Sequence, residues 1–200
     1  MKNQIREPQQ ERSIEKKNKI IQAGYELFSE VGYHGTNTVE IAKRAGVSTG
    51  IVYGYFQDKR DIMICVLQMY MDSVYEPVLE KVMNFAEPFD FETLVPAIVT
   101  DTIAMHEKHA KLHNTLHSLA TTDEAVNAKF IAMEDEITRS ISEKLAESGF
   151  NVHDAKEKVH LAMNIVQSFA HEYVFDKHPY IDYSAMRETV CKTIIYLFEN

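Results

Sequence analysis

The sequence predicts an all-α protein built from a head of three helices and a body of six helices. Apolar residues recur at spacings of three and four along almost the whole chain, which is the pattern of one buried face on each of a series of helices. The 200 residues include only 7 glycines and 5 prolines. No stretch alternates apolar and polar side chains as a half-buried strand would.

The charge of the chain is divided unevenly between its two parts. The formal net charge is -9, yet residues 1–60 carry 10 Lys and Arg against 7 Asp and Glu, while residues 61–200 carry 11 against 23. Basic residues are therefore concentrated in the head. A protein that contacts phosphates with one end and keeps them away from the other would show this asymmetry.

Composition also indicates where the protein works. The apolar fraction of 45% and the charged fraction of 26% are those of a soluble globular protein. We expect no membrane span, because no apolar run approaches the roughly 20 residues that one needs. The first ten residues are polar and lack a signal core, so a cytoplasmic protein is expected. Cys65 and Cys191 fall in helical apolar patterns and are predicted to be buried thiols, not a disulfide or a zinc site.

The head is predicted to follow a mobile polar tail over residues 1–14 and to occupy residues 15–58. Its first helix is expected over residues 15–31, with Gly32 in the position of a C-terminal cap. The inner face of this helix would present Ile20, Ala23, Leu27 and Phe28. Two short helices are expected at residues 38–45 and 49–55, joined by a turn in which Gly46 permits a sharp reversal and Ser48 caps the next helix.

The body is predicted over residues 59–200. Its first helix begins near Asp58, which can cap the amides of Lys59 to Asp61, and extends to at least Tyr75, with Pro77 expected to bend or break it. A loop is expected at residues 87–90, where Asp90 can cap the following helix. The other helices are expected at residues 91–106, 110–120, 123–148 with Gly149 as stop, 154–175, and 184–199 after a break at His178-Pro179.

The order of elements in the head is that of a helix-turn-helix. The first of the paired helices braces the second, which enters the major groove of DNA. Ile41, Ala42 and Ala45 give the bracing helix an apolar face, and Val47 fills the turn. The short helix after the turn needs an inner face, for which Ile51 or Val52 with Phe56 is suited. Its outer face would then present Thr49, Gly50, Tyr53 and Tyr55.

The string from Gly32 to Lys59 resembles the DNA-binding signature of the TetR family of repressors. The Ile-Ala pair, the Ala-Gly-Val-Ser turn, the Tyr-x-Tyr-Phe segment and the Lys after it all fall at the spacing of that family. The body resembles the family in helix count and order. The resemblance implies a transcriptional regulator and not an enzyme. It further implies a repressor that leaves a palindromic, double-stranded DNA operator when a small molecule binds the C-terminal domain.

The resemblance also implies which residues contact DNA. Thr38 and Lys59 would bind phosphates, and Tyr53 and Tyr55 would contact the DNA backbone. The residues expected at or near the DNA are Thr38, Ser48, Thr49, Gly50, Tyr53, Gly54, Tyr55 and Lys59. Gly54 stands where many members carry a longer side chain, so we expect few direct contacts between side chains and base edges. DNA shape could help. The tail residues Arg6, Arg12, Lys16 and Lys17 could help too, unless the tail is merely a solvated end.

For the body, the resemblance implies a homodimer through the last two helices and an effector pocket. Two apolar stripes are compatible with both a core and a partner: Val159, Ala162, Met163, Val166, Phe169, Ala170 and Tyr173, then Met186, Val190, Ile194, Ile195, Leu197 and Phe198. We hypothesise that the pocket is lined by Met69, Tyr70, Met105, His109, His113, Met133 and Gln167. Plain core packing is the alternative for each of them.

Four histidines form a stripe at helical spacing: His106, His109, His113 and His117. Such a stripe could hold a zinc or nickel ion, with Glu107, His160 or His171 completing the shell, and would make the protein a metal-responsive regulator. The alternative is a polar stripe between helices, and we assign neither a metal nor a cofactor. Two further alternatives are an enzyme on a helical scaffold and a regulator that answers to a partner protein, which would need no enclosed cavity.

Overall fold

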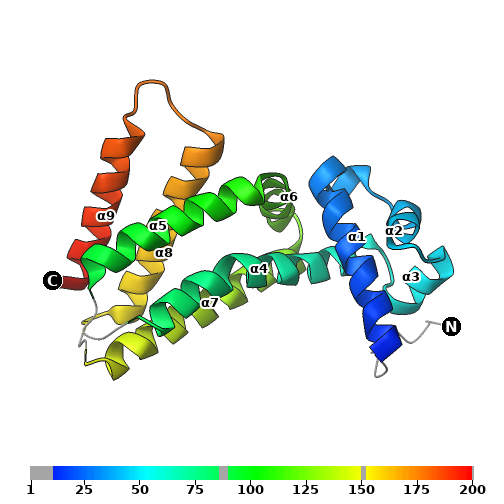
Figure 1. Cartoon of the computed structure of the whole chain (residues 1–200), viewed down its shortest axis with the longest axis horizontal. Helices are drawn as coiled ribbons and strands as arrows, with labels where there is room; N and C mark the ends of the chain where they lie inside the picture. The colour runs from blue at the N-terminus through cyan, green and yellow to red at the C-terminus, as the bar shows by residue number, and fades with distance from the viewer. Residues whose placement is uncertain (1–10, 86–89, 150–151, 200) are drawn as a thin grey trace. The chain divides into compact units, whose positions relative to one another are not determined.

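The computed structural model describes residues 11–85, 90–149 and 152–199, and its regular structure there is entirely helical (Figure 1). The helices are α1 (Glu11–Gly35), α2 (Thr38–Ala45), α3 (Thr49–Tyr55), α4 (Lys59–Met83), α5 (Phe91–Lys108), α6 (Ala110–Ala120), α7 (Glu124–Glu147), α8 (Ala155–Phe175) and α9 (Tyr183–Glu199). The all-α class and the count of nine helices are confirmed for the described residues.

The chain forms two compact units, which we call the first and the second unit. The first comprises Met1–Tyr70 with Lys111–Lys129, and the second comprises Met71–Ala110 with Phe130–Asn200. The first unit therefore contains α1 to α3, the beginning of α4, most of α6 and the start of α7. The sequence analysis had placed residues 111–129 in the body, because a helical pattern does not indicate which core a helix joins.

The first helix begins earlier than predicted. Residues 11–14 are helical rather than part of a mobile tail, and a hydrogen bond of 2.8 Å between the hydroxyls of Ser13 and Tyr55 attaches this end of α1 to α3. Arg12 and Lys16 lie exposed on α1, and Lys17 is half-buried there. The first ten residues, including Arg6, lie outside the described residues.

Gly32 interrupts α1 close to its predicted end. Its φ of 76° and ψ of 172° are not helical, and they lie in a region that disfavours residues with a Cβ. The short turn after Gly32 is held by the buried Thr36, whose hydroxyl donates to the Gly32 carbonyl at 2.8 Å. The chain is thereby redirected into α2.

The paired helices α2 and α3 have the predicted bounds. Asn37 caps α2, since its Oδ1 accepts from the amides of Val39 at 3.1 Å and Glu40 at 3.0 Å. The sequence analysis did not identify this cap. Gly46 adopts the left-handed conformation at φ 69°, and the Ser48 hydroxyl accepts from the Ile51 amide, as predicted.

Helix α4 begins where predicted but passes through its proline. Asp58 Oδ1 accepts from the amides of Arg60 at 2.7 Å and Asp61 at 3.1 Å. Pro77 does not end the helix, which continues to Met83. Of the described helices, α4 alone is long and apolar enough to cross a membrane by composition, a test that core helices also pass. Four of its side chains have no exposed surface, as expected of a core helix: Ile62, Met63, Val66 and Leu67.

The remaining helices agree with the prediction to within two residues. Asp90 caps α5 by accepting from the Thr93 amide at 3.3 Å, and Gly149 follows α7 with φ 76°. Residues 87–89 of the predicted loop lie outside the described residues. In the second unit, α5, α8 and α9 pack against one another. Their core includes the predicted stripe residues Val159, Val166, Phe169, Ala170, Val190, Ile194 and Ile195.

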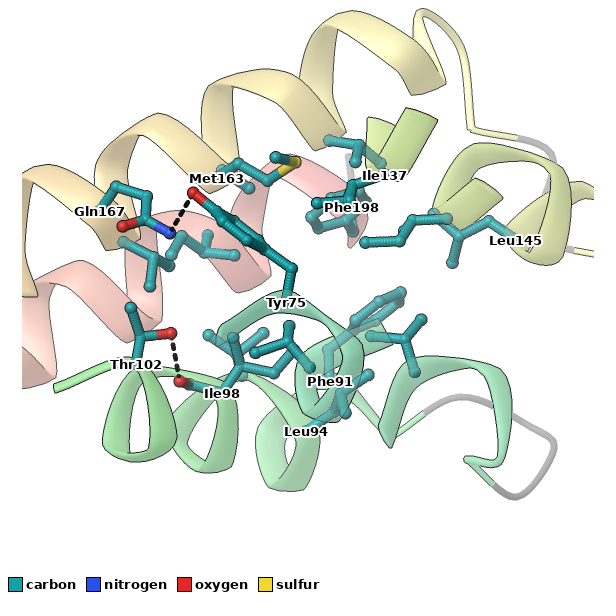
Figure 2. A pocket seen from close by; sticks show the side chains of 18 of the residues that line it. Tyr75, Phe91, Leu94, Ile98, Thr102, Ile137, Leu145, Met163, Gln167 and Phe198 are labelled. Carbon is teal, nitrogen blue, oxygen red and sulfur yellow. Dashed lines mark hydrogen bonds between the residues drawn. The ribbon is translucent and has the colours of Figure 1, made fainter. Parts of the chain in front are cut away.

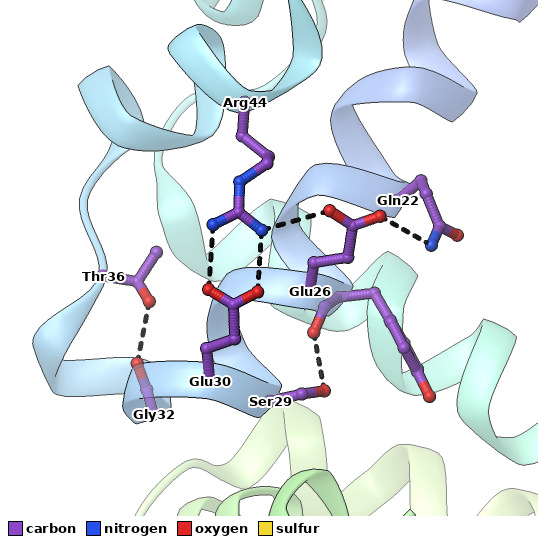
Figure 3. Close-up of polar contacts among 8 residues, drawn as sticks. Gln22, Glu26, Ser29, Glu30, Gly32, Thr36 and Arg44 are labelled. Carbon is purple, nitrogen blue, oxygen red and sulfur yellow. Dashed lines mark hydrogen bonds and ion pairs between the residues drawn. The ribbon is translucent and has the colours of Figure 1, made fainter.

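In the first unit, the predicted inner face of α1 is buried together with α2 and α3. Ile20, Ala23, Leu27 and Phe28 are 0–7% exposed, and of the two candidates on α3 it is Val52 that is fully buried. An ion-pair network on the surface also joins α2 to α1 (Figure 3). Arg44 donates to both carboxylate oxygens of Glu30 at 2.9 and 2.8 Å and to Glu26 at 3.2 Å. These hydrogen bonds raise the pKa of Arg44 and lower that of Glu30.

The packing of α1 on α4 leads to a prediction about Gly24. A Cβ added at this buried position would lie 2.6 Å from Cγ2 of Ile62, which is itself fully buried. Gly→Ala inside a helix ordinarily stabilises by about 1 kcal/mol, but overpacking costs about 1–3 kcal/mol. We therefore expect Gly24→Ala to lower the free energy of unfolding in urea, followed by circular dichroism. Gly54→Ala is the control, because a Cβ there meets nothing within 4 Å and should stabilise. Equal gains in both variants would contradict the close packing.

Candidate functional site

The N-terminal end of α2 and the outer side of α3 form an exposed face, which we call the α2–α3 face. Val39 is 61% exposed and Tyr53 is 46% exposed, although both are large apolar or aromatic side chains. The hydroxyls of Thr38 and Tyr53 are 3.0 Å apart and hydrogen bonded. Two of the predicted DNA contacts, one from each helix, are therefore brought together.

Two glycines on α3 have no packing function. Gly50 and Gly54 are exposed and one helical turn apart, so they lie on the same side of the helix. A Cβ at Gly54 would meet nothing within 4 Å, and one at Gly50 would meet only the Ser48 hydroxyl at 3.9 Å. Since a glycine inside a helix costs about 1 kcal/mol relative to alanine, these two weaken a seven-residue helix without any gain in packing. They leave the backbone of α3 open to close approach.

Lys59 is held by the protein itself. Its ammonium donates to the carbonyls of Tyr33 at 2.7 Å and Thr36 at 2.9 Å, and it lies 4.3 Å from the centre of the Tyr33 ring. Two of its three N–H groups are thus occupied by the turn that connects α1 to α2. The predicted phosphate contact of Lys59 stays a prediction, and it would have to use the third N–H group.

Arg60, the next residue of α4, is also engaged. It donates through Nε and Nη2 to the two carboxylate oxygens of Asp123, with 2.8 Å for the Nη2 bond. Asp123 also accepts from the amides of Ala125 and Val126 and so caps α7. The hydrogen bonds from Arg60 lower the pKa of Asp123 to about 2. This pair ties the start of α4 to the start of α7 within the first unit.

The basic residues of α1 and α2 that remain available to an anion include Arg12, Lys16 and Lys17, which the sequence analysis named, together with Lys43. Arg44, Lys59 and Arg60 are engaged as described, and Lys19 pairs with Glu15 at 2.8 Å. Four other basic side chains of α1 and α2 make no hydrogen bond or ion pair with described residues: Arg12, Lys16, Lys17 and Lys43. Lys43 is exposed on α2, and the other three lie near the start of α1.

The second unit contains an apolar cavity of about 100 Å³ (Figure 2). Its walls come from α4, α5, α7, α8 and α9, and apart from Tyr75, Thr102 and Gln167 they carry only apolar side chains. Gln167 is the one residue of the predicted pocket that lines this cavity. The sequence analysis missed Tyr75, whose position on an apolar helix gave no signal beyond core packing.

The other predicted pocket residues lie elsewhere. Tyr70 and His113 are buried in the first unit, where the Tyr70 hydroxyl and Nδ1 of His113 are 2.7 Å apart. Met69, Met105 and Met133 are half-buried, and His109 is buried at the end of α5. None of these six residues belongs to the lining of the apolar cavity.

The histidine stripe is divided between the two units. His106 and His109 belong to the second unit, and His113 and His117 to the first, where their ring centres are 4.2 Å apart. His106 Nδ1 donates to the Thr102 carbonyl at 2.9 Å. Nowhere in the described ranges do three or more His, Cys, Asp or Glu side chains form a group that could hold a metal ion.

Comparison with known proteins places the helix-turn-helix in a family. Residues 20–65 match the family model described as bacterial regulatory proteins, tetR family. The regulator HbdR of Aromatoleum sp. is 37% identical over 76 residues, and the fatty acid metabolism regulator protein of Bacillus subtilis is 39% identical over 67 residues. The helix-turn-helix segment therefore carries the DNA-binding signature of the TetR family, over residues 20–65. These two matches cover 38% and 34% of the chain, and 33% and 34% of the relatives, so the chain matches about a third of their length.

Solved structures of regulators assigned to the TetR family have the same fold as this chain over nearly its full length. A regulator from Mesorhizobium loti assigned to the TetR family has a TM-score of 0.77 at 20% identity, covering 95% of this chain and 98% of its own. One from Syntrophomonas wolfei has a TM-score of 0.68 at 21% identity, covering 94% and 96%. The second unit therefore has the fold of the C-terminal part of such proteins, at a sequence identity of 20–21% over the matched chains.

The contacts of Lys59 predict that it stabilises the TetR-type head. In Lys59→Met the aliphatic part of the side chain is kept, but the carbonyls of Tyr33 and Thr36 lose their donor, which costs about 1–3 kcal/mol. We expect a lower midpoint of thermal unfolding. Lys43→Met is the matched control on the exposed surface of α2 and should leave the midpoint unchanged. Equal midpoints for the two variants would show that the Lys59 contacts carry no stability.

Proposed function

We propose that the protein is a DNA-binding transcriptional regulator of the bacterial cytoplasm that acts as a homodimeric repressor and is released by a small molecule. The observation that carries this proposal is the exposed α2–α3 face, built from the segment that matches the TetR family over residues 20–65. The helix-turn-helix geometry and the exposed Tyr53 on α3 support binding of that face in the major groove.

In the proposed complex, the protein reaches the phosphates from three places. Thr38 stands at the N-terminus of α2, where the amides of the helix and the macrodipole favour an anion, and it lies beside the Tyr53 hydroxyl. Lys43 and the basic residues Arg12, Lys16 and Lys17 supply positive charge, and none of the four forms an ion pair within the described part of the chain. The third N–H group of Lys59 could donate to a further phosphate.

Reading of the bases is proposed to depend on close approach of α3. Gly50 and Gly54 have no side chains on the outward side of α3, so the helix backbone can come close to the base edges in the groove. Thr49 can donate to a base edge, and few other side chains of α3 can form such a hydrogen bond. Sequence-dependent DNA shape would then contribute much of the specificity.

The homodimer is proposed to use the outer surfaces of α8 and α9. The apolar stripes identified in the sequence are largely buried in the core of the second unit, so we propose other positions on the same two helices for the interface. Large apolar side chains nevertheless remain exposed on both helices, with Leu161 at 48% and Tyr196 at 65%. A twofold axis through this surface would pair four helices and present two heads to two half-sites.

Release by an effector is proposed to begin at the apolar cavity. Val74, Tyr75, Val78 and Val82 of α4 line it, and α4 also begins at Lys59 beside the α2–α3 face. A protein from Saccharomonospora viridis with this fold was solved in complex with choline, so a protein of this architecture can hold a small molecule. The cavity favours a small-molecule effector over a partner protein, and the divided histidine stripe gives the metal-responsive alternative no support.

Selection of bound sequences from random DNA duplexes tests the proposed function. We expect enrichment of a palindrome whose half-sites are spaced by about one helical turn or a little more, because the two heads of a dimer are related by a twofold axis. The dissociation constant for the enriched duplex is then compared with that for scrambled duplexes at one fixed salt concentration. Equal affinity for both would contradict an operator-specific regulator.

The variant Gly54→Ala tests whether stability and binding to the enriched duplex change in opposite directions. The added methyl group should stabilise α3 and raise the midpoint of thermal unfolding, yet it should weaken binding by about tenfold or more by obstructing close approach. Asn127→Ala is the control, because it should raise helix stability at an exposed position of α7 without touching the α2–α3 face. Unchanged binding by Gly54→Ala would remove the proposed role of the glycine.

The dimer interface is tested by placing charge on the exposed surfaces of α8 and α9. The double variant Leu161→Glu and Tyr196→Glu should raise the dimer dissociation constant by at least about tenfold, because buried like charges oppose association. Sedimentation equilibrium distinguishes the 23.0 kDa chain from its dimer. Ile131→Glu, at an equally exposed apolar position of α7, is the control. A double variant that stays dimeric would place the interface elsewhere.

A further inference from the structure

The cavity of the second unit has two chemically different ends. One end is formed by side chains without polar atoms, among them Val82, Leu145 and Phe198. The other end contains Tyr75 and Gln167, which face each other from α4 and α8 (Figure 2). Thr102 also lines the cavity, but its hydroxyl proton is donated to the Ile98 carbonyl at 2.9 Å. Polar recognition in the cavity therefore falls to Tyr75 and Gln167.

The pairing of these two residues leaves a donor for a ligand. Gln167 Nε2 donates to the Tyr75 hydroxyl oxygen over a long distance of 3.4 Å. This is the one hydrogen bond of the Tyr75 hydroxyl within the part of the chain that is described, and in it the oxygen is the acceptor. The hydroxyl proton can thus be donated to an acceptor placed between the two side chains, where the Gln167 amide could reach the same acceptor.

Charge at this end of the cavity disfavours an anion. No lysine or arginine lines the cavity, so a buried carboxylate would have no compensating cation and would incur a large desolvation penalty. Glu134 lies near enough for its charge to raise the pKa of Tyr75 further above the value that burial already produces. Burial likewise raises the pKa of Glu134. No charged side chain lines the cavity, so its polar end offers uncharged hydrogen-bond donors and pairs with neither an anion nor a cation.

We propose that the effector is an uncharged amphipathic molecule: a hydrocarbon chain or ring with a single hydrogen-bond acceptor such as a ketone, ester or lactone carbonyl. Its acceptor lies between Tyr75 and Gln167, and its hydrocarbon part extends toward Val82 and Phe198. This assignment deepens the proposed control by a small molecule and rests on it. It excludes carboxylates and large polar conjugates as the bound species.

Three ligands that share an eight-carbon skeleton and differ in the head group test the assignment: 2-octanone, octanoate and octylammonium. The chain lacks tryptophan, so binding is measured by isothermal titration calorimetry at pH 7.5 and by the shift of the thermal midpoint. We expect 2-octanone to bind at least about tenfold more tightly than either ion. Tighter binding of octanoate or octylammonium would overturn the proposal, and so would a failure of all three to bind.

Two variants place the ligand in the cavity. Tyr75→Phe removes the hydroxyl donor and should weaken 2-octanone binding by about threefold to tenfold, whereas Tyr196→Phe, at an exposed tyrosine, should not. Ala162→Leu places a larger side chain in the cavity from α8 and should abolish binding, while circular dichroism checks that the protein keeps its helical fold. If Tyr75→Phe were to unfold the protein, Ala162→Leu would still decide whether this cavity is the site. Full binding by Ala162→Leu would overturn the proposal.

The outcome is independent of DNA binding, because titrations are done without DNA. If 2-octanone binds but leaves the complex with the selected duplex intact, the ligand class stands and release by the effector fails. If the protein selects no duplex, the proposed function fails and the ligand measurement is unaffected.

Discussion

The arrangement of the first unit depends on how the start of α4 is fixed. The ammonium of Lys59 is held by two carbonyls of the turn that follows α1, while Arg60, the next residue, is held by the cap of α7. Asp58 caps α4 just before them. Since α3 ends at Tyr55, only three residues separate it from this anchored start. The orientation of the exposed α2–α3 face is thereby determined by contacts that lie behind it.

These anchors also explain why the charge of the head is a poor guide to the proposed DNA contacts. Several of its basic side chains compensate carboxylates or backbone carbonyls of the same unit, as Arg44 does with Glu26 and Glu30. A count of lysines and arginines therefore overstates the charge available to phosphates. What remains is the N-terminus of α2, Lys43 and the residues at the start of α1. Such a surface fits binding in which the position on DNA is set by a few phosphates and by the shape of the groove.

The sequence predicted the fold well because helix periodicity and capping are local. Ser48, Asp58 and Asp90 each cap the helix predicted for them, and α2 and α3 have the predicted bounds. The cavity could be predicted much less well. Tyr75 lines the cavity, whereas Tyr70 packs in the core of the first unit. Both tyrosines lie on the same apolar helix, α4, and the sequence pattern does not distinguish them. Whether such a residue lines a cavity or packs in a core depends on how helices that are distant in the sequence pack. The division of the histidine stripe between the two units depends on that packing as well.

The size of the cavity bears on how a ligand could change DNA binding. A ligand shifts an equilibrium between two arrangements only to the extent that it binds them with different affinity. A molecule that fitted the existing volume of about 100 Å³ would leave the walls in place and stabilise the present arrangement. A larger one must displace the walls, to which α4 contributes Val74, Val78 and Val82. Because the same helix begins at the Lys59 anchor, the proposed release from DNA requires a ligand too large for the cavity as it stands.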